Sequence, residues 1–213
     1  CHGLKEIELP NNTTYIGADA FGMCIALKKI NIPSSVITIG SYAFSSCESL
    51  VSITIPYSVT IIGDNAFSYC SSLESITVEE GNTAYHSAGN CLVATANKEL
   101  IAGCNDSIIP ADGSVVSIGE RAFSNRHQLT NIIIPNGITK IKKEAFWSCS
   151  RLLKIVLPES ITEIDSDAFY ACSELYFVYN NCNLTLIPGN IDSGRIAQNA
   201  RVVIRKDGIV SYK

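Results

Sequence analysis

Residues 39–59 read IGSYAFSSCESLVSITIPYSV, and a closely similar phrase, IGDNAFSYCSSLESITV, begins again at Ile62. Aligned on its Ala-Phe pair, the phrase returns every 23 residues within two groups of three copies. Self-similarity at a period of about 20 to 50 residues is typical of a solenoid, in which each repeat packs on its neighbours. The chain is therefore predicted to be a stack of coils. The phenylalanines of its expected core are Phe21, Phe44, Phe67, Phe123, Phe146 and Phe169.

The repeat unit reads I-G-x-x-A-F-x-x-C-x-x-L-x-x-I-x-I-P-x-S-V. Its second half, L-x-x-I-x-I, alternates as a strand does, with the central Ile pointing inward and its two neighbours outward. We expect successive copies to form a parallel sheet of about seven strands on one face, each ended by proline where one follows. The Ile-Gly pair is expected to be a turn. The Ala-Phe segment is expected to form a short helical or 3₁₀ turn behind the sheet, with the Phe rings stacked.

This unit resembles the leucine-rich repeat, in the 23-residue variety found in BspA-like surface proteins, over residues 1 to about 182. The resemblance implies a β-rich solenoid of the α/β horseshoe class and an extracellular or cell-surface location. Three positions depart from the pattern, since Arg126 replaces the repeated Cys and Lys142 and Asp165 replace the Gly. The chain opens in the second half of a repeat, so we expect it to be cut from a longer protein.

Two segments interrupt the repeat. An insertion of about residues 79–115 is predicted to contain one β-hairpin, with strands at 91–96 and 99–104 and a turn at Asn97 and Lys98. In that register Cys91 faces Cys104. These two form either a disulfide, which implies an oxidising compartment, or two buried or half-exposed thiols. Residues 183–213 are predicted to form a C-terminal β-hairpin that caps the solenoid of residues 1–182.

Composition and motifs disfavour several classes of function. The formal net charge is −4 and acidic residues outnumber basic ones, so electrostatic binding to nucleic acid is not expected. No apolar run reaches the roughly 18 residues of a membrane span, so no membrane insertion is expected. No catalytic motif is present, and we expect no enzyme activity and no cofactor.

Nine cysteines raise the question of a metal site or of disulfides. Five of them share one repeat position, which favours buried thiols that act as small hydrophobic groups. No C-x-x-C or Cys-His spacing brings ligands to one point, so no metal site is expected. The five are Cys24, Cys47, Cys70, Cys149 and Cys172. Asn-x-Ser/Thr sequons occur at Asn11, Asn12, Asn105 and Asn183, which permit glycosylation only in a secreted eukaryotic chain.

The residues that flank each central Ile project from the concave sheet face, which the family resemblance marks as the usual binding surface. Along the chain this series begins charged, becomes hydroxylated and ends apolar and aromatic. An exposed apolar and aromatic patch is typical of a protein contact. Alternatively, the C-terminal segment folds back over Phe177 and Tyr179 and buries them. The candidate ligand-binding residues are Asn131, Ile133, Lys154, Val156, Phe177 and Tyr179.

Two hypotheses of function follow. In the first, the chain is a non-catalytic binding module of a secreted or cell-surface protein, acting in adhesion or protein–protein interaction. Its partner would be a protein or glycan ligand, such as host extracellular matrix or cell-surface molecules. In the second, the repeats form a rigid spacer about 30 Å long within a larger surface protein and bind no ligand of their own.

Overall fold

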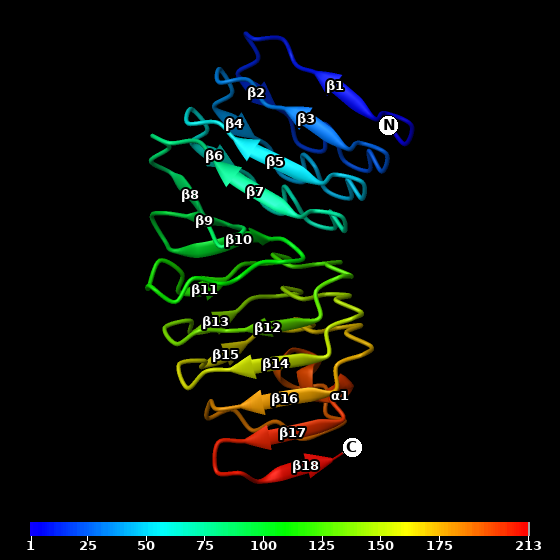
Figure 1. The fold of residues 1–213 in the computed structure, drawn as a ribbon, viewed down its shortest axis with the longest axis vertical. Coiled ribbons are helices and arrows are strands. Elements are labelled where there is room, and N and C mark those ends of the chain that lie inside the picture. Colours follow the sequence, from blue (N-terminus) through cyan, green and yellow to red (C-terminus); the bar gives the residue numbers. More distant parts are fainter. Residues whose placement is uncertain (213) are drawn as a thin grey trace.

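The computed structural model describes residues 1–212 as an elongated stack of coils, with the two ends of the chain at opposite ends of the stack (Figure 1). Each coil of the repeat adds one strand to a front sheet. The expected strands are all present, and each lies in register with its equivalent one repeat away, as Ile53 does with Ile76. They are β1 (Glu6–Glu8), β3 (Lys29–Asn31), β5 (Ser52–Ile55), β7 (Ser75–Val78), β12 (Asn131–Ile133), β14 (Lys154–Leu157) and β16 (Phe177–Asn180). Hydrogen bonds join them as β1-β3, β5-β7 and β12-β14-β16, and we call these three parts together the front sheet.

The Ile-Gly region is a second sheet, not the expected turn. Short parallel strands run behind the front sheet, and Gly40 N–H donates to the carbonyl of Ile16 at 2.8 Å, just as Gly63 N–H donates to Ile39. The repeated backbone bond from coil to coil therefore continues on this side of the molecule. The strands of this back sheet are β2 (Tyr15–Ile16), β4 (Thr38–Ile39), β6 (Ile61–Ile62), β11 (Ser117–Ile118), β13 (Lys140–Ile141) and β15 (Glu163–Ile164).

The Ala-Phe segments form consecutive hydrogen-bonded turns between the two sheets. Around Phe44, for example, Ser45 N–H donates to Tyr42 O and Cys47 N–H donates to Phe44 O. The turns do not become a helix because Tyr42 and Ser46 have positive φ angles of 57° and 58°. All six repeat phenylalanines are buried, and neighbouring rings within each group of three stack with centroids 5.0–5.6 Å apart.

The insertion, which we call the junction, holds three antiparallel strands where one hairpin was predicted. They are β8 (Tyr85–Ala88), β9 (Cys91–Ala94) and β10 (Glu99–Gly103), in the order β8-β9-β10. The predicted register is wrong, because the turn spans residues 95–98 and a bulge between Leu100 and Ala102 shifts the pairing. Cys91 consequently pairs with Gly103 and not with Cys104.

The two junction cysteines, Cys91 and Cys104, are free thiols, so of the two alternatives the structure has the pair of buried thiols and not the disulfide. Both are fully buried, but they belong to different hydrophobic cores: Cys91 packs in the core of the C-terminal repeats and Cys104 in that of the N-terminal repeats. Alternate residues of β9 divide in the same way, since Leu92 faces the core of the N-terminal repeats and Val93 that of the C-terminal repeats. The junction is thus a two-sided layer between two cores.

The C-terminal residues extend the front sheet. β17 (Val202–Arg205) pairs in parallel with β16, and β18 (Val210–Tyr212) returns antiparallel to β17 as a hairpin. The segment before β17 contains η1 (Ser193–Arg195) and α1 (Ile196–Asn199), and Phe169 N–H donates to Gly194 O at 2.8 Å, as Phe146 N–H donates to Ala168 O. Residues 183–205 therefore form one more, irregular coil, and the front sheet runs on past residue 182.

Candidate functional site

The front sheet presents an outward row of side chains from every strand. In the front strands from β3 to β17 the central residue is buried and the residues on either side of it point outward, as in Lys29, Ile30 and Asn31. The row is polar over the N-terminal repeats, where the Thr54 and Thr77 hydroxyls lie 2.9 Å apart on neighbouring strands. It becomes apolar over the C-terminal repeats. The structure brings all the predicted candidates onto this second half, because Asn131, Lys154 and Phe177 lie in register, as do Ile133, Val156 and Tyr179.

The aromatic end of the row is open to solvent. Phe177 is 38 % exposed and Ile133 is 69 % exposed, while Val156 and Tyr179 are half-buried. The Lys154 ammonium lies 4.7 Å from the centroid of the Tyr179 ring, a cation–π arrangement that holds the lysine stem flat along the sheet. The Phe177 ring centroid lies 6.3 Å from that of Tyr179.

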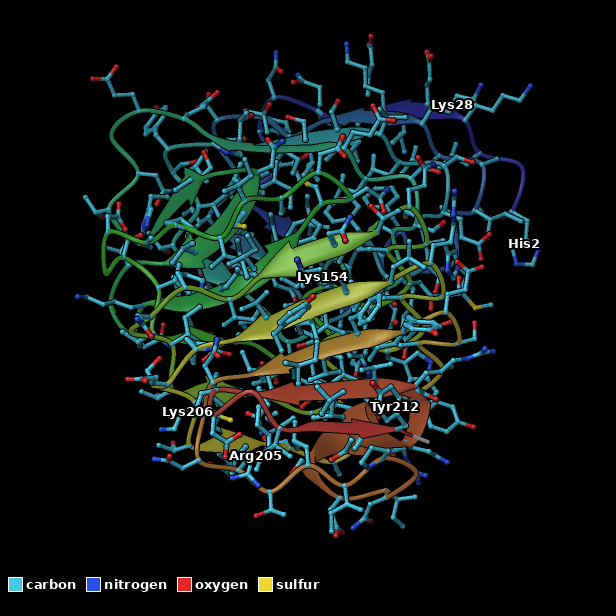
Figure 2. All side chains as sticks on the ribbon, turned by 60° about the horizontal axis from the view of Figure 1, so that its bottom comes forward. His2, Lys28, Lys154, Arg205, Lys206 and Tyr212 are labelled. Carbon is cyan, nitrogen blue, oxygen red and sulfur yellow. The ribbon has the colours of Figure 1, made fainter. Side chains whose placement is uncertain are left out.

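The terminal hairpin enlarges this surface instead of covering it. Because β17 pairs beside β16, Ile204 lies in register with Tyr179, and β18 places Val210 opposite Ile204 and Tyr212 opposite Val202. Tyr212 is 74 % exposed. In Figure 2, Lys154 and Tyr212 lie over the same run of strands, with Arg205 and Lys206 near the turn of the hairpin. The front-face patch thus consists of Ile133, Lys154, Val156, Phe177, Tyr179, Ile204, Val210 and Tyr212.

Sequence reasoning missed the hairpin part of the patch. The alternation of VVIR at 202–205 predicts a strand, but the 25 residues between Phe177 and its partner Val202 break the 23-residue spacing that assigned every other strand to the sheet. The spacing is longer because this coil has η1 and α1 where the other coils have an Ala-Phe turn.

The buried cysteines line up as expected, and each has a defined partner. The thiols of Cys47, Cys70, Cys149 and Cys172 donate to the carbonyl of the Phe one coil earlier, at 3.1–3.2 Å. Burial raises the pKa of Cys70 to about 11 and that of Cys149 to about 12, so both are thiols at neutral pH. Thiols of this kind are poor nucleophiles and poor metal ligands.

Within residues 1–212, no group of three or more His, Cys, Asp and Glu side chains is placed to hold a metal ion. The same residues contain no helix of the length and apolar character needed to cross a membrane. Among the sequons, the Asn105 side chain is not accessible for glycosylation, because it is buried, donates to Ser71 O at 2.9 Å and accepts from Gln128 N–H.

Residues 1–91 and 97–191 match the BspA type leucine rich repeat region in six copies. The chain belongs to the BspA-type leucine-rich-repeat family. Leucine-rich-repeat solenoids of this kind are typically non-catalytic. No protein of curated function matches the chain.

Solved structures of bacterial leucine-rich proteins have the same fold. The pneumococcal vaccine antigen PcpA is 30 % identical, with a TM-score of 0.74 over 84 % of this chain and 46 % of its own. A leucine rich cell surface protein from Faecalibacterium prausnitzii A2-165 is 26 % identical, with a TM-score of 0.65 over 97 % of this chain and 61 % of its own. A leucine-rich repeat protein from Eubacterium ventriosum, 22 % identical with a TM-score of 0.61, shares the fold. This BspA-type chain spans about half to two thirds of their length.

Proposed function

We propose that this BspA-type chain is a non-catalytic binding module of a secreted or cell-surface protein, and that it acts in adhesion by holding a protein ligand on the front-face patch. One observation carries the proposal: the terminal hairpin extends the sheet and leaves Phe177, Tyr179 and Tyr212 uncovered. Exposed aromatic and aliphatic side chains that adjoin on a rigid sheet match the composition of interface hot spots.

The patch favours a protein over a glycan. Its outward positions are branched aliphatic chains and aromatic rings, with Lys154 as the charged member, whereas the outward Ser and Thr positions lie over the N-terminal repeats. Lys154 and the nearby Lys206 place positive charge around the apolar centre, while Arg205 Nη2 is paired with Asp207 Oδ2 at 3.3 Å. This charge suits an acidic rim on the partner. The surface location rests on the likeness to a leucine rich cell surface protein and to a vaccine antigen.

The test is a binding assay of the 213-residue chain against immobilised matrix proteins, mucins and intact partner cells. A double variant, Phe177→Ser with Tyr212→Ser, is expected to lose at least about tenfold in affinity while its melting temperature stays close to that of the wild type. The matched control replaces Tyr15 and Tyr57 by Ser, because these tyrosines are 59 % and 55 % exposed away from the patch. Equal loss in both double variants would refute the assignment of the patch.

The rigid spacer is the second candidate. The coil-to-coil hydrogen bonds within each part of the back sheet and the two Phe stacks favour it, because both stiffen the long axis. It predicts that the wild-type chain binds none of the ligands above, yet still shows the unfolding free energy of a packed solenoid. Binding to mucin glycans alone, unaffected by the patch variants, would argue against both candidates.

A further inference from the structure

The junction opens a cleft on the opposite side of the molecule from the front-face patch. The cavity has a volume of about 570 Å³ and is lined by the last N-terminal coil, the junction and the first C-terminal coils. It exists because the back sheet is interrupted here: β6 pairs with β4 but with no later strand in residues 1–212. Tyr85 partly closes this edge, since its hydroxyl accepts from Ile62 N–H at 2.8 Å.

The interruption leaves backbone and side-chain acceptors unused. One coil earlier, the carbonyl of Ile39 accepts from Gly63 N–H, but no N–H within residues 1–212 takes the matching place on the carbonyl of Ile62. Asn65, which lines the cleft, donates through Nδ2 to Tyr42 Oη at 3.2 Å. Its Oδ1 is buried and has no partner. A buried amide oxygen without a donor is costly, so a ligand would gain a hydrogen bond to it when the Asn65 side chain turns toward the cleft.

The charged groups around the cleft leave an excess of negative charge. The nearby cations already have carboxylate partners: Lys142 Nζ lies 2.6 Å from Glu99 Oε2, while Arg121 Nε and Lys143 Nζ lie 2.6 Å and 3.4 Å from the two oxygens of Glu144. Asp64 has no ion pair among residues 1–212 and is exposed at the cleft. Glu120 also lines the cleft, and within residues 1–212 its one ion pair is with Arg121, whose Nη1 lies 3.3 Å from Glu120 Oε1.

We propose that the junction cleft binds a guanidinium group, as presented by an arginine side chain of a peptide. A guanidinium offers five N–H donors and no acceptor, which matches a cleft whose unused capacity lies in the Asp64 and Glu120 carboxylates, Asn65 Oδ1 and the Ile62 carbonyl. The negative charge disfavours phosphate and sulfated glycans. A neutral sugar would have to place hydroxyl acceptors against an acceptor-rich wall.

The experiment titrates the ¹⁵N-labelled 213-residue chain with N-acetyl-arginine amide and follows amide shifts at Gly63, Asn65 and Gly119. Saturable shifts at these positions are expected, with a Kd on the order of millimolar, as suits one small group in an open cleft. N-acetyl-citrulline amide, which has nearly the same shape without the charge, is expected to bind about tenfold more weakly. Equal binding of the two ligands, tighter binding of glucose, or the absence of saturable shifts would overturn the proposal.

Variants locate the site. Asp64→Asn keeps the side-chain shape and is expected to weaken binding about tenfold. Asn65→Gly tolerates the φ angle of 57° at that residue and removes the free amide oxygen, so it is expected to weaken binding as well. Glu74→Gln removes an exposed carboxylate outside the cleft and is expected to leave the Kd unchanged. If Glu74→Gln weakens binding as much as Asp64→Asn, the effect is one of net charge and the site is refuted. The front-face variants Phe177→Ser and Tyr212→Ser should not change these shifts, so this proposal fails or stands independently of the proposed function.

Discussion

At the scale of single residues, every repeat holds two residues in the left-handed region without using glycine. They stand two positions before and two positions after the repeated Phe, as Asn65 and Tyr69 do around Phe67, with φ angles of 57° and 59°. A non-glycine residue in this region costs about 1–2 kcal/mol, and only Asn and Asp tolerate it comparatively well. These positions cannot be recognised from the sequence, because only four of the twelve are Asn or Asp and the others include Ser, Tyr, Glu and Arg.

Ala171→Gly should therefore stabilise the chain. Ala171 has a φ of 58° and a side chain without hydrogen-bonding groups, so glycine would relieve the left-handed strain at the cost of a more flexible unfolded state. We expect a net gain of about 0.5–1 kcal/mol in the free energy of unfolding, measured by urea titration. Ala18→Gly, at an exposed position without positive φ, serves as the control and should lose stability. Loss of stability in both variants would show that the left-handed geometry is not strained.

The buried thiols make stability fall at alkaline pH. Burial raises the pKa of Cys70 to about 11 and that of Cys149 to about 12, against the opposing effect of Arg126, while an unfolded thiol titrates near its ordinary pKa of 9.0. Below pH 9 both states are protonated and the full stability is present. Above pH 9 the unfolded state ionises first, so stability is lost as the pH rises toward 11 to 12.

The free energy of unfolding, measured by urea titration from pH 8 to pH 11, should consequently decline by up to roughly 1.4 kcal/mol per pH unit for each thiol. The double variant Cys70→Ala with Cys149→Ala should start lower, because it loses two thiol hydrogen bonds to Phe44 and Phe123 carbonyls, but it should decline less steeply. Parallel slopes for wild type and variant would contradict the raised pKa values.

At the scale of the coil, periodicity predicted the front sheet and missed the back one, for a physical reason. A strand such as Ser52–Ile55 is long enough to show an alternation of buried and exposed residues. Thr38–Ile39 has two residues, too few to show a period, and its stability comes from stacking between coils. The Ile-Gly pair that looks like a turn in one repeat becomes a strand only when the neighbouring repeats are present.

The junction shows the same limit in another form. The Phe stack within each group stops at Phe67 and resumes at Phe123, and Gly103 occupies the missing ring position, because its N–H donates to Ala122 O as a repeat Phe would. A Cβ atom on Gly103 would lie 2.0 Å from Cε1 of Phe123. The sequence shows Gly103 merely as part of a hairpin, since the repeat alignment does not extend across the insertion.

Gly103→Ala should accordingly destabilise the chain by about 1–3 kcal/mol, the usual range for overpacking, because the Phe123 ring is enclosed and cannot move away freely. Thermal unfolding followed by circular dichroism measures the change. Gly3→Ala is the matched control, as a Cβ there meets no atom within 4 Å. An unchanged melting temperature for Gly103→Ala would show that the junction repacks more easily than the structure implies.

At the scale of the whole molecule, the chain has two hydrophobic cores in one stack. The buried residues divide into a cluster around Phe21, Phe44 and Phe67 and a second around Phe123, Phe146 and Phe169, with β9 and β10 as the layer between them. The repeat alignment predicted the two groups of repeats, and the row of front-face candidates followed from it. The extension of the patch by β17 and β18, and the cleft at the junction, depend on how irregular segments pack, which no repeat position encodes.

Arg126 joins these two cores. It stands where the repeat has Cys, is fully buried, and donates from Nε to Gly103 O at 2.7 Å, from Nη1 to Ser124 O at 3.0 Å and from Nη2 to Phe67 O at 3.3 Å. The three acceptors belong to the junction, the C-terminal repeats and the N-terminal repeats respectively. A thiol at this position reaches one carbonyl of the preceding coil, as Cys149 does with Phe123 O. The departure from the repeat thus joins its two halves directly, beside contacts such as that of Tyr69 N–H with Ser124 Oγ at 3.2 Å.

Restoring the repeat by Arg126→Cys should weaken that connection. We expect a loss of about 2–4 kcal/mol, because buried carbonyls lose charge-assisted donors and a cavity replaces the guanidinium. Arg126→Lys should also lose stability, since an ammonium cannot reproduce the planar set of donors.

The variant Arg126→Cys should also unfold less cooperatively, because coupling between neighbouring repeats sets the cooperativity of a solenoid. The single calorimetric transition expected of the wild type should divide into two in this variant, with hydrogen exchange showing one core opening before the other. Arg151→Cys, at an exposed position in the C-terminal repeats, is the control and should leave one transition at the wild-type temperature. A single transition in Arg126→Cys, at an unchanged temperature, would mean that the junction layer alone couples the two cores.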